Sequence, residues 1–272
     1  MSSRETMIEV EGLGKRYWVG GHWLIDHRGM HAMVDRALKA PSQFISNRFS
    51  KKQAAAAHPV IEGHMKWALR DVSFKLGKGE VLGIVGHNGA GKSVLLKLLS
   101  RITRPTEGYA KLHGQVSSML EAGTSFHHEL TGRENIRLSG AILGMRRNEI
   151  DERIDEIIAF SEVEEYLDTP VKRYSTGMIL RLGFSVAAHL DTDIMLIDEI
   201  LAVGDQSFKR RCVEKMRNAA RSGKTVLFVS HDMEILKDIS DRAILIREGS
   251  LVMDGTPEDV VAEHLLHPGP QQ

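Results

Sequence analysis

Short apolar runs recur along the chain and predict the strands of a sheet. The near-continuous runs are residues 81–85, 194–197, 226–229 and 243–246. A parallel strand covered by helices on both faces is apolar at nearly every position, so these runs predict a mostly parallel sheet. Apolar and polar residues alternate at 7–10 and at 68–76, which predicts two further strands, and another is expected around 115–120.

Helical spacing dominates the middle of the chain. Residues 133–190 contain few β-branched runs, and 148–161 is their clearest amphipathic stretch. Near the end, residues 256–259 supply a threonine N-cap, a proline at the first helical position and an acidic third residue, so a last helix is expected to run to about Leu266. Strands that alternate with helices in this way predict an α/β fold.

A segment between the two N-terminal strands departs from this pattern. Residues 20–65 begin with two glycines, have helical spacing over 30–39, break at Pro41 and end in an alanine-rich stretch. Residues 20–52 carry six basic and two acidic side chains among several large apolar ones. A basic amphipathic surface of this kind suits anionic lipid headgroups or a pyrophosphate. A helix packed on its own domain with a solvated basic face is the alternative.

Composition restricts the functions that the chain can have. Lys plus Arg and Asp plus Glu both number 36, so no overall field favours nucleic acid as a partner. Cys212 is the only cysteine, and the first ten residues are charged and contain no signal sequence. No stretch approaches the roughly 20 apolar residues that a membrane helix needs. We therefore expect a cytosolic protein that meets a membrane only through a partner or a surface helix.

The most specific motif follows the predicted strand at 81–85. It consists of Gly86, His87, Asn88, Gly89, Ala90, Gly91, Lys92 and Ser93. This is the full pattern of a phosphate loop, in which backbone N–H groups close around phosphate oxygens. Lys92 is expected to reach the β- and γ-phosphates, Ser93 to ligate Mg²⁺, and the helix that starts at Lys92 to point its positive end at the phosphates. The strand and helix flanks argue against a chance glycine-rich turn, so the sequence predicts a nucleoside triphosphate site.

Polar residues also follow two other predicted strands. Asp198 and Glu199 come directly after 194–197, where Asp198 can hold the Mg²⁺ shell and Glu199 can act as the general base. His231 follows 226–229, at the strand end where open α/β sheets bind ligands, and is a candidate sensor of the γ-phosphate. A solvated carboxylate and a structural histidine are the alternatives, and the phosphate loop in the same chain favours the functional interpretation.

Taken together, these motifs resemble the ATPase subunit of an ABC transporter. The similarity includes residues 174–178 as the signature motif, 202–205 as the D-loop and 230–232 as the loop that carries the histidine. It implies a single P-loop NTPase domain over residues 1–272, with a mostly parallel core sheet, an antiparallel β region and a helical subdomain at about 126–190. ATP and Mg²⁺ are the implied cofactors.

The resemblance further implies a homodimer that encloses two ATP molecules between its subunits. Ser175 and Gly177 of one subunit would then contact the γ-phosphate held by the phosphate loop of the other, and Asp205 is a further implied nucleotide contact. Tyr17 stands where the family places an aromatic residue that stacks on adenine. Ser175 also fits an ordinary helix cap, Tyr17 also fits plain core, and Trp18 competes for the stacking position.

Two motifs of this chain depart from the usual family pattern, and they restrict the resemblance to a subgroup of the family. The signature reads YSTGM where most members have LSGGQ, and residues 119–127 lack the usual glutamine, with Glu121 nearest to its place and a candidate Mg²⁺ ligand. Together with residues 129–136, these departures look like the ATPases that export lipid-linked polysaccharides such as O-antigen, capsule and teichoic acid. The implied partners are a polytopic permease and the lipid-linked polysaccharide, at the cytoplasmic face of the cell membrane. In that family a segment before the phosphate loop lies near the membrane.

Other functions remain open. A transporter ATPase for another substrate would share every motif. ABC proteins that act on DNA or ribosomes resemble tandem cassettes or cassettes split by coiled coils, whereas this chain has one cassette, no sustained heptads and no net basic charge. A regulatory module without turnover is disfavoured because Lys92, Glu199 and His231 complete the hydrolytic set. Since the chain stops near Leu266, we do not expect it to carry an added carbohydrate-binding domain.

Overall fold

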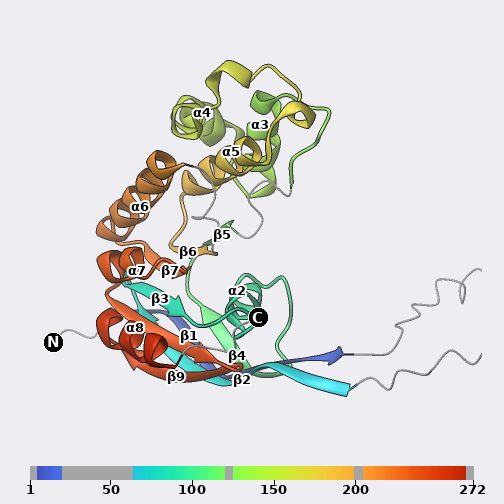
Figure 1. Ribbon diagram of the computed structural model, residues 1–272. Helices are drawn as coiled ribbons and strands as arrows, with labels where there is room; N and C mark the ends of the chain where they lie inside the picture. The colour runs from blue at the N-terminus through green and yellow to red at the C-terminus, as the bar shows by residue number, and fades with distance from the viewer. Residues whose placement is uncertain (1–4, 20–63, 120–124, 199–204, 268–272) are drawn as a thin grey trace, which may run out of the picture. The chain divides into compact units, whose positions relative to one another are not determined.

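The computed structural model describes residues 5–19, 64–119, 125–198 and 205–267 (Figure 1). The chain divides into two compact units, one formed by Met1–Arg16 with Trp67–Gln272 and the other by Tyr17–Lys66. The helix predicted at 30–39 lies outside the described residues. His64 and Met65, which the sequence placed in the insertion, belong to a strand.

The elements of the described residues follow the predicted alternation. The strands are β1 (Thr6–Val19), β2 (His64–Gly77), β3 (Val81–Val85), β4 (Glu107–Leu112), β5 (Val116–Ser118), β6 (Ile194–Ile197), β7 (Thr225–Val229), β8 (Arg242–Arg247) and β9 (Ser250–Gly255). The helices are α2 (Lys92–Leu99), α3 (Gly132–Ile142), α4 (Arg147–Ser161), α5 (Thr176–Ala188), α6 (Gln206–Arg221), α7 (Met233–Ile239) and α8 (Pro257–Leu266), with 3₁₀ turns η2 (Glu164–Tyr166) and η3 (Val171–Arg173).

The central sheet has the strand order β5-β6-β7-β3-β8-β9. Its first five strands pair in parallel, and β9 adds an antiparallel edge to β8. Every residue of β3, β6 and β7 is buried, as their continuous apolar runs predict. A second sheet, in the order β2-β1-β4, pairs β1 and β4 antiparallel. The predicted mostly parallel core with an antiparallel β region is therefore confirmed.

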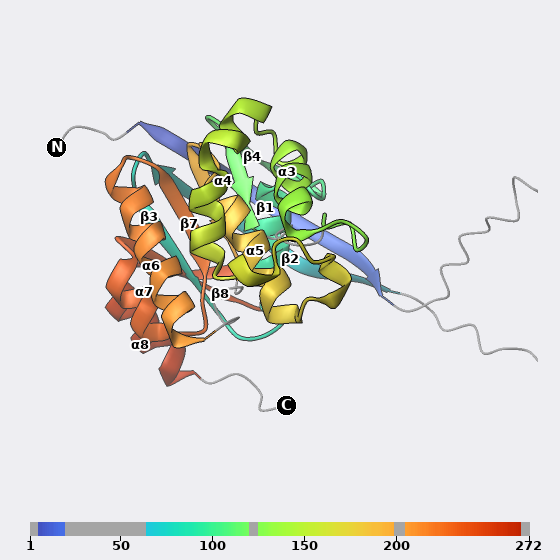
Figure 2. The same cartoon turned by 90° about the horizontal axis from the view of Figure 1, so that it is seen from above.

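The central sheet separates two hydrophobic cores. Along β7, Leu227 and Val229 belong to the core shared with α2 and the second sheet, whereas Val226 and Phe228 belong to the core shared with α5 to α8. Because successive side chains of a strand point to opposite faces, α2 covers one face and α6, α7 and α8 cover the other. The latter three stand side by side along one flank (Figures 1 and 2).

Helix α6 buries one stripe of side chains against the sheet. Phe208, Cys212 and Met216 follow one another at intervals of four residues, and each is no more than 2% exposed. This spacing places them on one face of the helix. Burial raises the pKa of the Cys212 thiol to about 12. The cysteine is thus part of the core.

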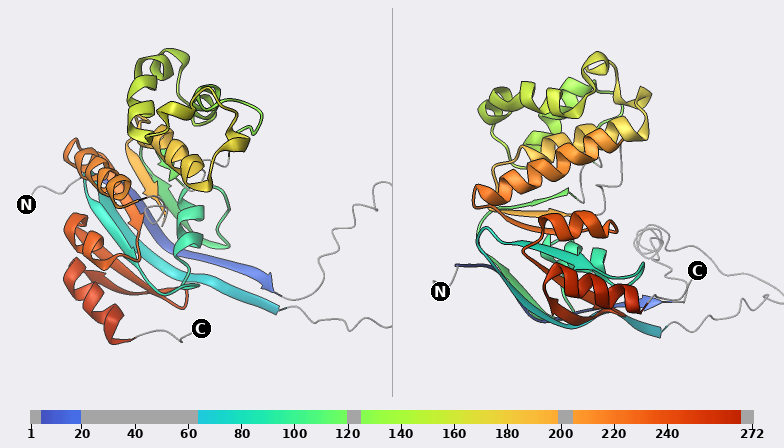
Figure 3. Two further views of the ribbon diagram at one scale, coloured as in Figure 1. Left: turned by 45° about the horizontal axis from the view of Figure 1, so that its top comes forward. Right: turned by 60° about the vertical axis from the view of Figure 1, so that its left-hand side comes forward.

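Helices α3, α4 and α5 pack on one another around a third core (Figure 3). The amphipathic stretch predicted at 148–161 is α4. Thr131 starts α3 with a capping box, since its hydroxyl accepts from the Glu134 backbone N–H and the Glu134 carboxylate accepts from the Thr131 N–H. This cluster carries the predicted signature motif at the start of α5. Within the described ranges, each helix is too short or too polar to span a bilayer.

Candidate nucleotide-binding site

The predicted phosphate loop connects the central strand β3 to α2. Two of its glycines allow the chain to pass close to other backbone atoms. A Cβ on Gly86 (φ 155°) would lie 2.3 Å from the Ile246 carbonyl oxygen, and one on Gly91 (φ 111°) would lie 2.5 Å from the Ala68 carbonyl oxygen. Both contacts are shorter than van der Waals distance, and a side chain would strain both positive φ angles. The loop conformation therefore requires glycine at both positions.

Lys92 is the first residue of α2, as predicted, and its side chain folds back over the loop. The ammonium donates to the Gly86 carbonyl oxygen at 2.6 Å and to the His87 carbonyl oxygen at 3.0 Å. The residue is only 6% exposed. These bonds hold a positive charge inside the loop. Ser93 follows in the first turn of α2 and is exposed.

Strand register brings the other predicted groups to the same edge of the sheet. Val229 of β7 stands beside Ile84 of β3, and Ile197 of β6 stands beside Phe228 of β7. The carboxyl ends of these parallel strands therefore meet, and Asp198 and His231 lie just beyond them. Asp198 is half-buried and His231 is exposed. Phosphate loop, carboxylate and imidazole thus emerge from three neighbouring strands.

The residues of this edge fit a magnesium ion that is shared with a nucleotide. The Ser93 hydroxyl and the Asp198 carboxylate are hard oxygen donors, the type that Mg²⁺ prefers. Within the described ranges, no group of three or more His, Cys, Asp or Glu side chains could hold a metal. Two protein oxygens suit Mg²⁺, which typically takes its remaining ligands from phosphates and water.

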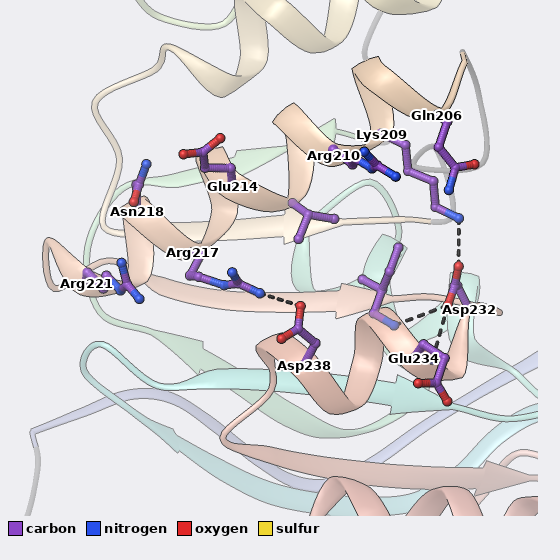
Figure 4. Close-up of a pocket in the computed structure, with 12 residues that line it drawn as sticks. Gln206, Lys209, Arg210, Glu214, Arg217, Asn218, Arg221, Asp232, Glu234 and Asp238 are labelled. Atoms are coloured by element: carbon purple, nitrogen blue, oxygen red, sulfur yellow. Dashed lines mark hydrogen bonds and ion pairs between the residues drawn. The ribbon is translucent and has the colours of Figure 1, made fainter.

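A salt bridge fixes the turn that carries His231. Asp232 caps α7 by accepting from the backbone N–H groups of Glu234 and Ile235, and its other oxygen lies 2.7 Å from the Lys209 ammonium on α6 (Figure 4). The Lys209 hydrogen bond is the main cause that lowers the pKa of Asp232. No pattern in the sequence indicated this pair, which joins α6 to the turn at the end of β7.

The same helices enclose a surface pocket. It has a volume of about 520 Å³ and lies between α6 and α7 (Figure 4). Arg217 of α6 pairs with Asp238 of α7 across it, and Arg210 and Glu214 also line it. Its cations and carboxylates occur in similar numbers, so the pocket has no strong preference for either charge.

The predicted signature motif begins α5. Ser175 is its N-cap, and the Ser175 hydroxyl accepts from the Met178 backbone N–H at 3.2 Å. Ser175 therefore acts as a helix cap, as the alternative interpretation stated. A contact of Ser175 with the nucleotide of a partner subunit stays a prediction. Ser175 and Thr176 are exposed, and a Cβ on Gly177 would touch only the Ser175 hydroxyl, at 3.8 Å. The start of α5 is accessible within the described part of the chain.

Asp205 has a structural role in the cap of α6. One carboxylate oxygen accepts from the Phe208 backbone N–H at 2.9 Å and from the Ser207 hydroxyl at 2.8 Å, and the other lies 2.9 Å from Arg181 of α5. The backbone hydrogen bond from Phe208, with those from Ser207 and Arg181, strongly lowers the pKa of Asp205. Arg181 also pairs with Glu162 at 2.9 Å. The network joins α5 and α6, and the nucleotide contact of Asp205 stays a prediction.

The remaining predicted residues have less structural evidence. Tyr17 is 40% exposed and Trp18 is 52% exposed near the end of β1, so neither is plain core in the described structure. Glu199 and Glu121 lie outside the described residues, as do the other residues of the predicted D-loop, 202–204. The roles of Glu199 as base and of Glu121 as metal ligand stay predictions.

One contact of the phosphate loop had no signal in the sequence. The ring of His264 in α8 lies 4.4 Å from the ring of His87, centroid to centroid, and the His87 Nε2 lies 3.0 Å from the His267 carbonyl oxygen. His264 is only 9% exposed. Burial is the main cause that lowers its pKa, and His87 and Lys92 add to it by repulsion. Neutral His264 thus supports the loop from the C-terminal helix.

A phosphate loop that connects a buried central strand of a mostly parallel sheet to the start of a helix defines a P-loop nucleoside triphosphatase. A family profile described as ABC transporter matches residues 69–202. The O-antigen export system ATP-binding protein RfbB of Klebsiella pneumoniae is 45% identical over 205 residues, which cover 75% of this chain and 83% of that protein. The chain belongs to the ABC transporter family of ATP-binding proteins, and its fold is that of the family's ATPase domain.

Two further relatives agree with this assignment, and a solved structure agrees with the fold. The ABC transporter protein AbcA of Aeromonas salmonicida is 43% identical over 78% of this chain and 70% of its own length. The teichoic acids export ATP-binding protein TagH of Lactococcus lactis is 39% identical over 85% of this chain and 52% of its own length. The structure of a dimeric, post-hydrolysis ATP-binding cassette bound to ADP and Pi has a TM-score of 0.67 at 18% identity, covering 92% of this chain and 99% of that one. This last likeness concerns the fold alone.

Proposed function

We propose that this chain is the ATP-hydrolysing subunit of a transporter that exports a lipid-linked polysaccharide across the cytoplasmic membrane. The observation that carries the proposal is the complete phosphate loop, with Lys92 held inside it, in a chain 45% identical to an O-antigen export ATP-binding protein over most of that protein's length. The similarity to a teichoic acids export protein points to the same chemical class of cargo. Both polymers are charged or hydroxyl-rich glycans, which cannot cross a bilayer unaided.

Within the site, each group has a distinct task. The phosphate loop would bind the α- and β-phosphates through backbone N–H groups, and Lys92 would neutralise charge on the β- and γ-phosphates. Mg²⁺, held by Ser93 and Asp198, would supply further charge stabilisation to the phosphates. Glu199 would accept a proton from the attacking water, and His231 would contact the γ-phosphate from the end of β7.

The proposal includes a homodimer and a membrane permease. Ser175 and Gly177 stand at the accessible start of α5, so their backbone N–H groups and the helix dipole are available to an anion held by a second subunit. The phosphates would then lie between the two subunits, which explains why ATP would favour dimerisation. The 45% identical relative is named as the ATP-binding protein of an export system, so the path for the polymer would be provided by a separate permease.

Genetics and reconstitution together test the proposal. Deleting the gene should abolish the surface polysaccharide, and the wild-type gene but not the Glu199→Gln variant should restore it. The purified chain, reconstituted with its permease, should hydrolyse ATP faster when the lipid-linked polymer is supplied. A deletion strain with normal surface polysaccharide would exclude this cargo. If the reconstituted complex instead responds to another substrate, the chain serves a transporter for that substrate.

A further inference from the structure

A second pocket lies at one edge of the central sheet, and the phosphate loop lies at the opposite edge. It has a volume of about 300 Å³ and is lined by residues of α4 and α6, by the segment that follows α5, and by Met195 and Lys224. Lys224 directly precedes β7, so the pocket stands at the amino edge of the parallel strands. The phosphate loop, Asp198 and His231 all follow strands and stand at the carboxyl edge. The two sites are therefore separate.

Three cations from different elements line this pocket. They are Arg153 of α4, Lys215 of α6 and Lys224 before β7, against the single carboxylate of Glu156. The Lys224 ammonium donates to the Leu190 carbonyl oxygen at 3.2 Å and lies at the same distance from a carboxylate oxygen of Asp191. These contacts anchor Lys224 at the rim.

Arg153 and His189 are fixed as well. The Arg153 guanidinium donates to the His189 backbone carbonyl, and the His189 Nδ1 lies 2.7 Å from the Ser185 carbonyl oxygen. His189 is only 6% exposed, and its pKa is lowered chiefly by burial, so its ring is neutral near pH 7. The pocket is thus built from side chains whose positions are already set, with a neutral imidazole in its wall.

Lys215 differs from the other two cations. Its ammonium forms no hydrogen bond or ion pair with any residue in the ranges that the structure describes. Burial lowers the pKa of Lys215 most, and repulsion from Lys224 and Arg153 lowers it further, although Glu156 opposes the shift. A half-buried ammonium that faces two other cations is electrostatically unfavourable, because like charges repel and water is partly excluded. A bound anion would attract all three cations and make the electrostatic energy of the pocket favourable.

We propose that this pocket binds a small phosphate-class anion through Lys215, Arg153 and Lys224. A guanidinium and two ammonium groups that line one pocket provide the usual donors for phosphate oxygens. The volume stands at the lower end of the range for ligand pockets and suits phosphate or pyrophosphate better than a nucleotide. The lining residues also provide no ring besides His189 on which a base could stack.

Such an anion would connect two parts of the chain. Arg153 belongs to the cluster of α3, α4 and α5, whereas Lys215 belongs to α6 and Lys224 directly precedes β7 of the central sheet. An anion bound between them would strengthen the contact of α4 with α6. Because a ligand that binds only the folded state stabilises it, binding would also raise the melting temperature.

Calorimetry on the full chain tests the proposal. The phosphate loop is first saturated with a non-hydrolysable ATP analogue and magnesium, so that neither phosphate nor pyrophosphate can enter it. Each anion is then titrated into wild-type chain and into the Lys215→Gln, Lys215→Arg and Arg210→Gln variants. Arg210 lies on another face of α6, in the pocket beside α7, and provides a control of equal charge change. Melting temperatures are measured in parallel.

We expect one anion site per chain, an affinity about tenfold weaker in Lys215→Gln, and near wild-type affinity in Lys215→Arg and Arg210→Gln. Binding should weaken as the pH rises into the range where Lys215 loses its proton. No binding to the wild-type chain, or equal losses in Lys215→Gln and Arg210→Gln, would overturn the proposal. If Lys215→Gln does not fold, Arg153→Gln serves in its place with the same expected loss. Comparing the two anions shows whether the pocket is filled by one phosphate group or by two.

Discussion

Lys92 illustrates how a single side chain can be prepared for an anion. Its ammonium is buried, and two carbonyl oxygens of the phosphate loop hold it in position. A phosphate group close by would gain a strong charge-assisted interaction with this ammonium. The residue therefore contributes to binding as well as to catalysis, and its removal should affect both.

Replacing Lys92 with Met should weaken ATP binding at least tenfold and abolish turnover, because it removes the cation while keeping most of the side-chain volume. Nucleotide affinity is measured by calorimetry and turnover by phosphate release. Lys97→Met is the matched control, since Lys97 lies on the exposed face of the same helix. Equal ATP affinity in the two variants would exclude the assigned role of Lys92.

Replacing Glu199 with Gln should leave ATP binding intact and lower turnover by roughly 10²-fold or more, because the amide keeps the shape of the side chain and cannot accept the proton. Single-turnover hydrolysis with purified protein separates this step from product release. Glu258→Gln, at the exposed start of α8, is the control. Hydrolysis close to the wild-type rate would place the general base elsewhere.

At the scale of elements, the sequence predicted the strands that are buried on both faces. β3, β6 and β7 are continuous apolar runs, and the positions of Asp198 and His231 followed from them. Strands β4 and β9 were not predicted, because half or more of their residues are exposed and their sequences are mixed. Amphipathic α6 was also missed.

Contacts between elements that are far apart along the chain could not be predicted from the sequence. Lys209 pairs with Asp232, and His264 packs on His87, yet no periodic pattern relates the residues of either pair. Such contacts depend on the crossovers that place α6 beside α7 and α8 beside the phosphate loop. They support the residues around the candidate site, whereas the placement of Lys92, Asp198 and His231 at one edge of the sheet was predictable from motifs.

Replacing Lys209 with Met should lower the melting temperature by about 1–2 °C at neutral pH, since an exposed ion pair contributes on the order of 0.5 kcal/mol. The pKa of Asp232 is lowered in the folded chain, so its contribution is present above the ordinary pKa of an aspartate and is lost as the pH falls through the lowered value. The difference between variant and wild type should therefore shrink in acid. A difference that persists unchanged at low pH would mean that Lys209 acts through packing instead.

At the scale of the whole molecule, the start of α5 offers a way to separate nucleotide binding from assembly. Gly177 has open space around its Cβ position and lies in the first turn of the helix, where a carboxylate is favourable for the helix dipole. Aspartate at this position should therefore be compatible with the fold of a single chain. In the proposed dimer it would face the partner's γ-phosphate and repel it.

In a Glu199→Gln background, we expect Gly177→Asp to bind ATP normally and to remain monomeric, whereas Gly177→Ala dimerises with ATP. Light scattering after gel filtration gives the mass in each case, and calorimetry gives the affinity. ATP-dependent dimers of the aspartate variant would show that the signature motif does not contact the nucleotide across the interface.

The only cysteine of the chain lies on the buried face of α6, in the core shared with the central sheet. A buried thiol whose pKa is raised to about 12 is almost entirely protonated at neutral pH, and it reacts with a disulfide reagent only when the surrounding structure opens. The rate of that reaction therefore measures how often this part of the core opens. A bound nucleotide should make this opening rarer and the reaction slower. A cysteine introduced on the surface would react first, so fluorescent probes can be attached to this chain without removing Cys212.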